Sequence, residues 1–495
     1  MRKFVTNHEE NQNPSGKEGE SFVTQSPETQ LLVIGAGPGG YAAAFYAADH
    51  GLEVTLVDKE PTPGGVCLFK GCIPSKALLH AAKALSDARA AKNFGIEFGQ
   101  PKIDLEKMRQ WKEGIITKLT GGLGALCKQR KIKYLQGQAS FLDAQRVRVH
   151  RQDTTEQTLS FQHAVLATGS TPIRLPHLPD SCRVLDSTSA LKMDDIPESL
   201  LVIGGGYIGL ELGSVYAALG SQVTVVEMTD RLLTGIDPDL TALLTKRLNV
   251  VFHKILLNTK VARAQELSDG IKVSLQPNAG QMTEQSYTKI LVCVGRRPET
   301  TGLGIEKTRI ELTQRGFIKV DGQRRTAEPA IFAIGDITGE PMLAHKASHE
   351  GHVAVEAILG KKSIFEPKAI PAIVFTDPEI ACCGLTETQA AKDNRPVEVV
   401  KFPWAASGRA LTLDRIDGMT KLLVDPQTKR VLGAGLVGAG AGELISEAVL
   451  AVEMGAMAED IQWSIHPHPT LSETIMEAAQ AIGGQSTHLY KPKRN

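Results

Sequence analysis

The sequence has no excess of charge of either sign, because 55 Lys and Arg residues balance 55 Asp and Glu residues in 495 positions. A general nucleic-acid binder carries a basic excess, so only a local basic patch could support that function. No apolar run reaches the roughly 18 residues that a membrane span needs. We therefore predict a soluble globular protein without nucleic-acid or membrane partners. Its length exceeds one ordinary core and predicts two to four domains.

Cysteine is also scarce, which excludes the disulfide framework of a secreted protein. Residues 1–27 are polar, have no apolar segment and contain four Glu residues, unlike secretory or mitochondrial targeting segments. We expect residues 1–27 to be disordered and the compartment to be reducing and cytoplasmic. The seven cysteines are Cys67, Cys72, Cys127, Cys182, Cys293, Cys382 and Cys383. In a reducing compartment a close pair is more often catalytic or metal-binding than structural.

A glycine-rich turn between a strand and a helix occurs twice. In the first copy, the apolar run 31–34 precedes the turn Gly35–Gly40, and a second strand ends at Asp58. The second copy has the turn Gly204–Gly209 and ends at Glu227, with the same spacing of 23 positions from first glycine to acid. A single match can be any tight strand-to-helix turn, but two concordant copies predict two dinucleotide-binding units.

The residues of these turns have separate predicted roles. The first glycine permits the tight turn, the second lets the backbone approach a pyrophosphate at the helix N-terminus, and the third permits close packing. These positions are Gly35, Gly37 and Gly40 in the first copy and Gly204, Gly206 and Gly209 in the second. Asp58 and Glu227 would bind ribose hydroxyls. Glu227 would repel a 2′-phosphate, which predicts NAD rather than NADP at the second site.

A cysteine pair lies in the segment 64–76. Cys67 and Cys72 flank Gly71, and Pro74 suits the first turn of a helix that continues over 77–90. Cys72 would then lie at a helix N-terminus, where the helix dipole stabilises a thiolate, with Lys76 one turn away. The alternatives are two buried thiols or half of a zinc site. Since no second close Cys or His pair accompanies this one, we predict no metal.

This segment closely resembles the redox-disulfide signature GGxCxNxGCIPSK of the class I flavoprotein disulfide reductases, with Phe69 where Asn is usual. The resemblance extends from about residue 30 to about residue 482. The segments Leu343–His345 and Phe402–Arg409 are most similar to bacterial members that oxidise dihydrolipoamide. The resemblance implies FAD and NAD as cofactors and Cys67 and Cys72 as the redox pair.

The resemblance also implies further cofactor contacts. Asp336 would bind the ribityl chain of FAD, and Ala139 stands where Gly is usual and would contact FAD through its backbone. Other implied FAD contacts are Lys59, Gly65, Val66, Lys76 and Ala344. The implied NAD contacts are Gly204, Gly205, Gly206, Tyr207, Ile208, Glu227, Val261, Cys293, Val294, Gly295 and Arg296. Glu211 would pair with Lys76. Tyr207 would gate the nicotinamide pocket or serve only in packing.

Two histidines and an acid lie close together near the C-terminus. Spacing alone favours a structural or metal-binding role for His466 and His468. The resemblance, through the pattern HxHPTxSE, implies instead that His468 is the acid–base, that Glu473 orients it, and that the base reaches the other subunit of a homodimer. Pro467 stands where relatives often have Ala. We interpret Cys382 and Cys383 as strand residues.

We therefore expect an α/β fold of two Rossmann-like dinucleotide-binding domains plus a C-terminal α+β dimerisation domain. The expected ranges are 28–172 for FAD and the redox disulfide, 173–297 for NAD, 298–365 for a central domain completing the FAD site, and 366–495 for the interface. The implied reaction oxidises protein-bound dihydrolipoamide and reduces NAD⁺, with a lipoyl-bearing acyltransferase or a glycine-cleavage carrier protein as partner. The alternatives are a glutathione-type or mercuric reductase and a non-catalytic flavoprotein.

Overall fold

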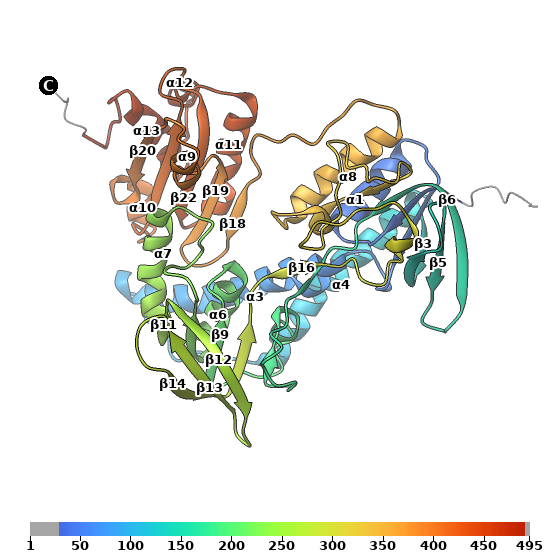
Figure 1. Ribbon diagram of the computed structural model, residues 1–495. Helices are drawn as coiled ribbons and strands as arrows, with labels where there is room; N and C mark the ends of the chain where they lie inside the picture. The colour runs from blue at the N-terminus through green and yellow to red at the C-terminus, as the bar shows by residue number, and fades with distance from the viewer. Residues whose placement is uncertain (1–28, 491–495) are drawn as a thin grey trace, which may run out of the picture.

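Three regions of sheet and helix follow one another along the chain in the computed structural model, which describes residues 29–490 (Figure 1). The N-terminal region, in blue, lies at the right of the view, the middle region, in green, at the bottom, and the C-terminal region, in red, at the upper left. The predicted disordered segment 1–27 lies outside the described residues. Among residues 29–490, no helix has the length and apolar character needed to cross a membrane.

The N-terminal region is built on a seven-stranded sheet. Its strands are β1 (Thr29–Ile34), β2 (Val54–Asp58), β3 (Lys133–Gln136), β4 (Gln138–Phe141), β5 (Arg146–His150), β6 (Glu156–Leu166) and β17 (Ile331–Ala333). The order is β3-β2-β1-β6-β5-β4, with β17 also paired to β6. The pairs β1–β2, β1–β6 and β2–β3 are parallel, and the residues of β1 from Leu31 to Ile34 are buried, as expected for a strand covered on both faces.

Helices cover this sheet and carry the cysteine segment. They are α1 (Pro38–Asp49), α2 (Gly65–Lys70), α3 (Cys72–Ala90), η1 (Ala91–Phe94), α4 (Leu105–Gln129) and α8 (Ala344–Ile358). Pro38 occupies the first turn of α1, where its missing N–H costs no hydrogen bond. The start of α3 at Cys72 confirms the predicted position of this cysteine at a helix N-terminus.

The middle region repeats the parallel arrangement. Its five-stranded parallel sheet has the order β11-β10-β9-β15-β8 and confirms the second strand–turn–helix unit. The strands are β8 (Val184–Leu185), β9 (Ser199–Ile203), β10 (Gln222–Val226), β11 (Lys254–Leu256) and β15 (Lys289–Val292), and the helices are α5 (Ser187–Ala190), α6 (Tyr207–Leu219) and α7 (Pro238–Val251). A three-stranded antiparallel sheet packs beside it, formed by β12 (Thr259–Glu266), β13 (Ile271–Pro277) and β14 (Thr283–Tyr287).

The chain returns to the N-terminal region after this sheet. The strands β7 (Ser170–Pro172) and β16 (Arg296–Pro298) pair where the two regions connect, and η2 (Ile305–Lys307) and η3 (Gly335–Thr338) follow. The segment 298–365, expected as a central domain, forms no independent sheet within the described residues, because β17 joins the first sheet and α8 packs against α1. The domain boundaries themselves stay predictions.

The C-terminal region is an antiparallel sheet with helices, in agreement with the predicted α+β class. Its strands, in the order β18-β19-β22-β21-β20, are β18 (Ala372–Val374), β19 (Glu379–Gly384), β20 (Glu398–Pro403), β21 (Met419–Val424) and β22 (Val431–Gly438). Its helices are α9 (Glu387–Lys392), η4 (Trp404–Ala406), α10 (Gly408–Thr412), α11 (Ala441–Met454), α12 (Ala458–Trp463) and α13 (Glu473–Ile482). Cys382 and Cys383 lie on β19, as predicted.

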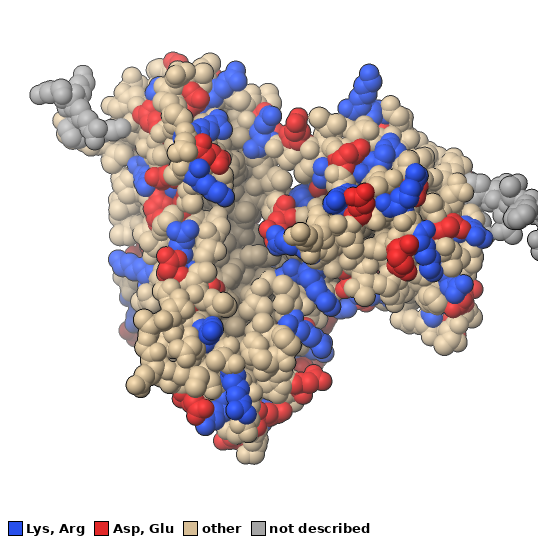
Figure 2. Space-filling model, in the orientation of Figure 1, with Lys and Arg blue, Asp and Glu red and all other residues tan. Residues whose placement is uncertain are grey.

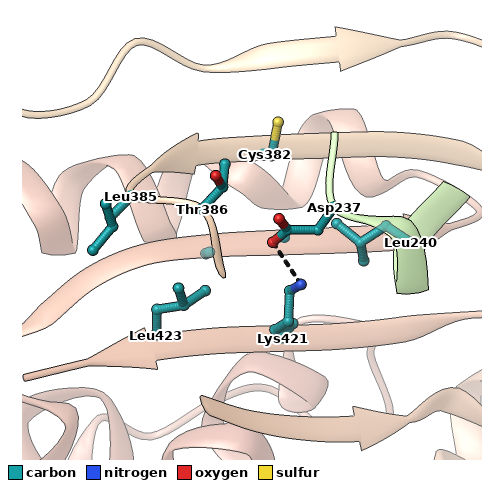
Figure 3. A pocket seen from close by; sticks show the side chains of 9 residues that line it. Asp237, Leu240, Cys382, Leu385, Thr386, Lys421 and Leu423 are labelled. Atoms are coloured by element: carbon teal, nitrogen blue, oxygen red, sulfur yellow. Dashed lines mark hydrogen bonds and ion pairs between the residues drawn. The ribbon is translucent and has the colours of Figure 1, made fainter. Parts of the chain in front are cut away.

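A buried ionic cluster joins the middle region to the C-terminal region. The ammonium of Lys421, which is only 1% exposed, lies 2.6 Å from Asp237, 2.8 Å from Asp239 and 3.3 Å from Glu387. Figure 3 shows Lys421 directed at Asp237, with Cys382 lining the same small pocket. The three carboxylates lie close enough together to hold a cation, and the Lys421 ammonium already fills that role.

The surface of the molecule is hollowed between the C-terminal and N-terminal regions (Figure 2). On the face in view, basic and acidic side chains are interspersed rather than gathered into a patch of one sign.

Candidate active site

A cavity of about 640 Å³ lies where the N-terminal and middle regions meet. The first glycine turn, the cysteine segment, the start of α6, and the segments after β6 and β17 all contribute to its wall. Ligands of parallel sheets bind outside the carboxyl ends of the strands, and β1, β6 and β17 all end at this wall.

The first glycine turn has the backbone geometry that its sequence predicts. Gly35 has φ +102°, and a Cβ there would lie 2.3 Å from the carbonyl oxygen of Ala167. A Cβ at Gly40 would lie 1.8 Å from the carbonyl oxygen of Gly35, so both positions require glycine. The Asp58 carboxylate accepts hydrogen bonds from the N–H of Ala36 at 2.6 Å and of Glu60 at 2.9 Å. Burial raises the pKa of Asp58, while these two bonds lower it.

The second glycine turn repeats this geometry. Gly204 has φ +107°, and a Cβ there would lie 2.4 Å from the carbonyl oxygen of Cys293. The Glu227 carboxylate accepts hydrogen bonds from the N–H of Gly205 at 2.6 Å and from the N–H of Thr229 at 2.9 Å. Each terminal acid therefore holds the glycine turn of its own unit.

The two cysteines both line the cavity, with Cys67 on α2 and Cys72 as the first residue of α3. Their thiols are free and hydrogen-bonded to each other. The hydrogen bond from Cys67, followed by the nearby Lys76 ammonium, outweighs burial and lowers the pKa of Cys72 to about 7. The hydrogen bond to Cys72 and burial raise the pKa of Cys67. Of the two, Cys72 is therefore the thiol that ionises at neutral pH.

The predicted pair between Lys76 and Glu211 is present. The Lys76 ammonium donates to Glu211 Oε2 at 2.8 Å, and Glu211 is only 3% exposed. Glu211 comes from α6 of the middle region, so this ion pair crosses from one region to the other.

A hydrogen-bonded chain surrounds Asp336 on the opposite wall of the cavity. Its carboxylate accepts from the Ser170 hydroxyl at 2.5 Å, and Arg296 Nε donates to the same hydroxyl at 2.7 Å. Arg296, which was expected at the NAD site, lines this cavity, as do Tyr207 and Ile208. The Gly335 N–H, in turn, donates to the buried Glu350 at 2.6 Å.

The two C-terminal histidines have different surroundings. The His468 side chain is 77% exposed, and among residues 29–490 only its Nδ1 has a hydrogen-bond partner, Glu473, at 2.9 Å. His466 is 6% exposed, and its two ring nitrogens contact the Ser464 carbonyl oxygen and Glu447, each at 2.8 Å. His468 is therefore the histidine with a ring nitrogen available for proton transfer. His468 precedes α13 in the C-terminal region, whereas α3 lies below that region in Figure 1. His468 is not among the residues that line the cavity.

The predicted site residues fall into two groups. The cavity is lined by Gly35, Gly37, Asp58, Lys59, Gly65, Val66, Cys67, Cys72, Lys76, Tyr207, Ile208, Arg296, Asp336 and Ala344. Those outside its wall are Gly40, Ala139, Gly204, Gly205, Gly206, Glu227, Val261, Cys293, Val294, Gly295, His468 and Glu473. Ala139 is buried in β4, where it pairs with Val149 without a positive φ, so this position does not require glycine.

Several residues that line the cavity belong to no sequence motif and were not predicted. They include Ser170, Arg174, Asp186, Ser187, Glu299 and Met342. The sequence signal that could have identified Ser170 is its position just after β6, because a ligand at a parallel sheet contacts the loops that follow its strands.

Comparison with known proteins places this geometry in context. Residues 29–351 match the family described as pyridine nucleotide-disulphide oxidoreductase, and residues 370–479 match its dimerisation domain. The chain is 48% identical over 472 residues to a dihydrolipoyl dehydrogenase of Haemophilus influenzae, covering 95% of this chain and 98% of that protein. It is 46% identical over 462 residues to a protein of the same name from Geobacillus stearothermophilus, covering 93% and 98%.

Two solved structures are also similar. A crystal structure of LpdA from Mycobacterium tuberculosis matches with a TM-score of 0.85 and 26% identity, over 92% of this chain and 99% of that one. The HOCl-induced flavoprotein disulfide reductase RclA of Escherichia coli matches with a TM-score of 0.81 and 27% identity, over 92% and 100%.

Proposed function

Because the chain belongs to the pyridine nucleotide-disulphide oxidoreductase family, we propose that it is an FAD-dependent dihydrolipoamide dehydrogenase. It oxidises protein-bound dihydrolipoamide to lipoamide and reduces NAD⁺ to NADH. The observation that carries this proposal is the pair Cys67 and Cys72 at the cavity wall, with the pKa of Cys72 lowered to about 7. A thiol of low pKa leaves readily in thiol–disulfide exchange, so the pair suits the transfer of two electrons from a dithiol substrate.

The residues around the cavity fit FAD. The glycine turn 35–40 precedes the N-terminus of α1, where backbone N–H groups and the helix dipole favour a pyrophosphate. We assign Asp58 and Lys59 to the adenosine half of FAD, Asp336 to its ribityl chain, and Ala344 to a backbone contact. Bound FAD supplies the two-electron relay between the thiols and NAD⁺. We assign the second glycine turn and Glu227 to NAD.

The thiols carry the substrate half-reaction. In the oxidised enzyme Cys67 and Cys72 share a disulfide, and a substrate thiolate attacks Cys67 Sγ while Cys72 leaves as a thiolate. The second substrate thiolate then attacks the mixed disulfide, which closes lipoamide and releases Cys67. Two electrons pass to the protein in this exchange. One substrate proton goes to Cys67 and the other to the catalytic base.

We assign His468 as that base. Within the described part of the chain its Nε2 has no hydrogen-bond partner, and Glu473 holds Nδ1 and stabilises the imidazolium. A second hydrogen bond, from the Thr470 N–H to Glu473 at 2.8 Å, fixes the carboxylate. Because His468 does not line the cavity of its own chain, we propose that it serves the cysteines of a second copy in a homodimer. The matched dimerisation domain contains both His468 and Glu473.

We further propose the setting in which the reaction takes place. The substrate is the lipoyl group of an acyltransferase in a 2-oxo acid dehydrogenase complex, or of a glycine-cleavage carrier protein. We place the enzyme in the cytoplasm, where a dithiol substrate stays reduced.

Steady-state assays of the purified holoenzyme test this function. Dihydrolipoamide with NAD⁺ should give the highest catalytic efficiency, and glutathione disulfide or Hg²⁺ with NADH or NADPH should give little turnover. Faster turnover with either of the latter two substrates would reassign the enzyme to another member of the family. Bound flavin without any turnover would make it a non-catalytic flavoprotein.

A further inference from the structure

An aromatic ring from the C-terminal region lies against the Lys76 ammonium. Phe375, between β18 and β19, has its ring centroid 4.4 Å from Lys76 Nζ. This distance is within the range in which a cation is attracted to the face of a ring. Phe375 belongs to the matched dimerisation domain, although Lys76 belongs to the N-terminal region.

The backbone of Phe375 binds the partner of the same lysine. Its N–H donates to Glu211 Oε1 at 3.0 Å, while Lys76 donates to Glu211 Oε2 at 2.8 Å. The nearly buried Glu211 carboxylate therefore bridges α3 to the segment that follows β18, and both oxygens are occupied. With Phe375 present, the Lys76 ammonium is held from two sides, by a carboxylate and by a ring.

The position of Lys76 matters because its charge acts on Cys72. Lys76 lines the cavity and lowers the pKa of Cys72, whereas Glu211 raises it. The other titratable groups that face Cys72 are Cys67 on α2, Tyr41 on α1 and Tyr207 on α6. Lys76 is the cation of this set, so a displaced ammonium would leave the thiolate with less stabilisation.

We propose that Phe375 is a positioning residue that holds the Lys76 ammonium beside Cys72 and so couples the dimerisation domain to the reactivity of the redox thiols. This inference rests on the proposed function, in which Cys72 leaves the disulfide as a thiolate. Phe375 is absent from the cavity wall and acts only through Lys76. Because the ring is only half-buried, its replacement is compatible with folding.

The test measures the ionisation of Cys72 in the holoenzyme. After anaerobic reduction by two electrons, the long-wavelength charge-transfer absorbance between the Cys72 thiolate and FAD is followed from pH 5 to pH 9. In the wild-type protein its midpoint should lie near the Cys72 pKa of about 7. The Phe375→Leu variant should raise the midpoint by about 0.5–1 pH unit, as expected for loss of a partly desolvated cation–π contact. Phe375→Tyr, which keeps a ring, should restore the wild-type midpoint.

A double-mutant cycle separates positioning from packing. If Phe375 acts through the ammonium, adding Phe375→Leu to Lys76→Met should cause no further shift. Phe45→Leu is the matched control, because it removes a ring 4.9 Å from Arg130 at a distant surface, and it should leave the midpoint unchanged. Far-UV circular dichroism and FAD content verify folding. Phe375→Met, whose flexible apolar side chain has no ring, replaces any Leu variant that loses FAD.

An unchanged midpoint in both Phe375→Leu and Phe375→Met would overturn the inference, as would a shift of equal size with and without Lys76. If the wild-type protein shows no charge-transfer absorbance at all, the proposed function fails instead, so the two failures are distinguishable.

Discussion

At the scale of single residues, we predict that Glu227 determines the choice between NAD⁺ and NADP⁺. Its carboxylate already binds the Gly205 N–H at 2.6 Å, which fixes a negative charge beside the second glycine turn. The neighbouring Met228 is 66% exposed and has room for a longer side chain. We predict that Glu227→Gln combined with Met228→Arg shifts preference toward NADP⁺ by about 1–3 kcal/mol. The measurement is the ratio of kcat/KM values for NAD⁺ and NADP⁺, and equal values in the wild-type enzyme would contradict the assignment.

His468 and His466 provide a matched pair of substitutions. His468→Gln should slow reduction of the enzyme by dihydrolipoamide by about 10²–10⁴-fold, the usual contribution of a positioned acid–base group. His466→Gln should leave this rate within a few-fold, since both nitrogens of His466 serve contacts to Ser464 and Glu447. Both rates are measured by rapid mixing. Reduction of the enzyme by NADH is the control, because it requires no deprotonation of a substrate thiol. The reverse order of the two variants would move the base to His466.

At the scale of elements, the first glycine turn sets the path of β1 into α1. We predict that Gly40→Ala loses FAD, because the added Cβ would lie 1.8 Å from the Gly35 carbonyl oxygen. Gly114→Ala in α4 is the control, since a Cβ there meets nothing within 4 Å. It should stabilise the protein by roughly 0.5–1 kcal/mol, because alanine is the better helix former. Thermal unfolding and the FAD content of the purified proteins measure both effects, and a fully FAD-loaded Gly40→Ala protein would contradict the close approach.

The elements that could be predicted from sequence are those with a local signal. The turn at Gly35 and the start of α3 at Cys72 follow from short spacings, and the structure has both. Ser170 and Phe375 escaped prediction because their roles arise from long-range contacts, with Asp336 and Lys76 respectively. The motif that contains Arg296 gives its position in the chain but not the hydrogen bonds from its side chain to Ser170.

At the scale of the whole molecule, the Lys421 cluster is a buried polar link between the middle and C-terminal regions. Lys421→Met should destabilise the protein by about 3–5 kcal/mol, because it leaves the buried Asp237 carboxylate without its cation. Lys429→Met, which breaks an exposed pair with Glu398, should cost less than about 1 kcal/mol. Denaturant unfolding of both variants measures the difference, and similar values for the two would contradict a buried link.

The same cluster predicts an acid-sensitive contact. Burial raises the pKa of Asp237, but hydrogen bonds from Lys421, Thr388 and Glu387 outweigh it and lower the pKa to about 2. A carboxyl with a depressed folded pKa stabilises the protein above its unfolded pKa, near 4, and this contribution is lost as the pH falls through about 2. The melting temperature followed from pH 5 to pH 2 should therefore fall less in Asp237→Asn than in the wild-type protein. Parallel curves would show that Asp237 does not contribute.

The position of His468 outside its own cavity predicts complementation between inactive chains. A Cys72→Ser homodimer and a His468→Gln homodimer should each be nearly inactive. A heterodimer of the two should recover about half of the wild-type activity per dimer, because one of its two symmetric sites combines an intact cysteine pair with an intact histidine. Activity after co-expression and tandem affinity purification provides the measurement. A heterodimer without activity would place the base in the same chain as its cysteines.

The pairing of β17 with β6 also determines when the N-terminal sheet can be completed during synthesis. The first strand of the N-terminal sheet begins at Thr29, but β17 and Asp336 follow only after the whole middle region. When the ribosome has just completed the middle region, the N-terminal sheet therefore still lacks β17. The cavity also lacks the lining residues that follow β17. The N-terminal region can therefore complete its sheet only after the middle region has been synthesised.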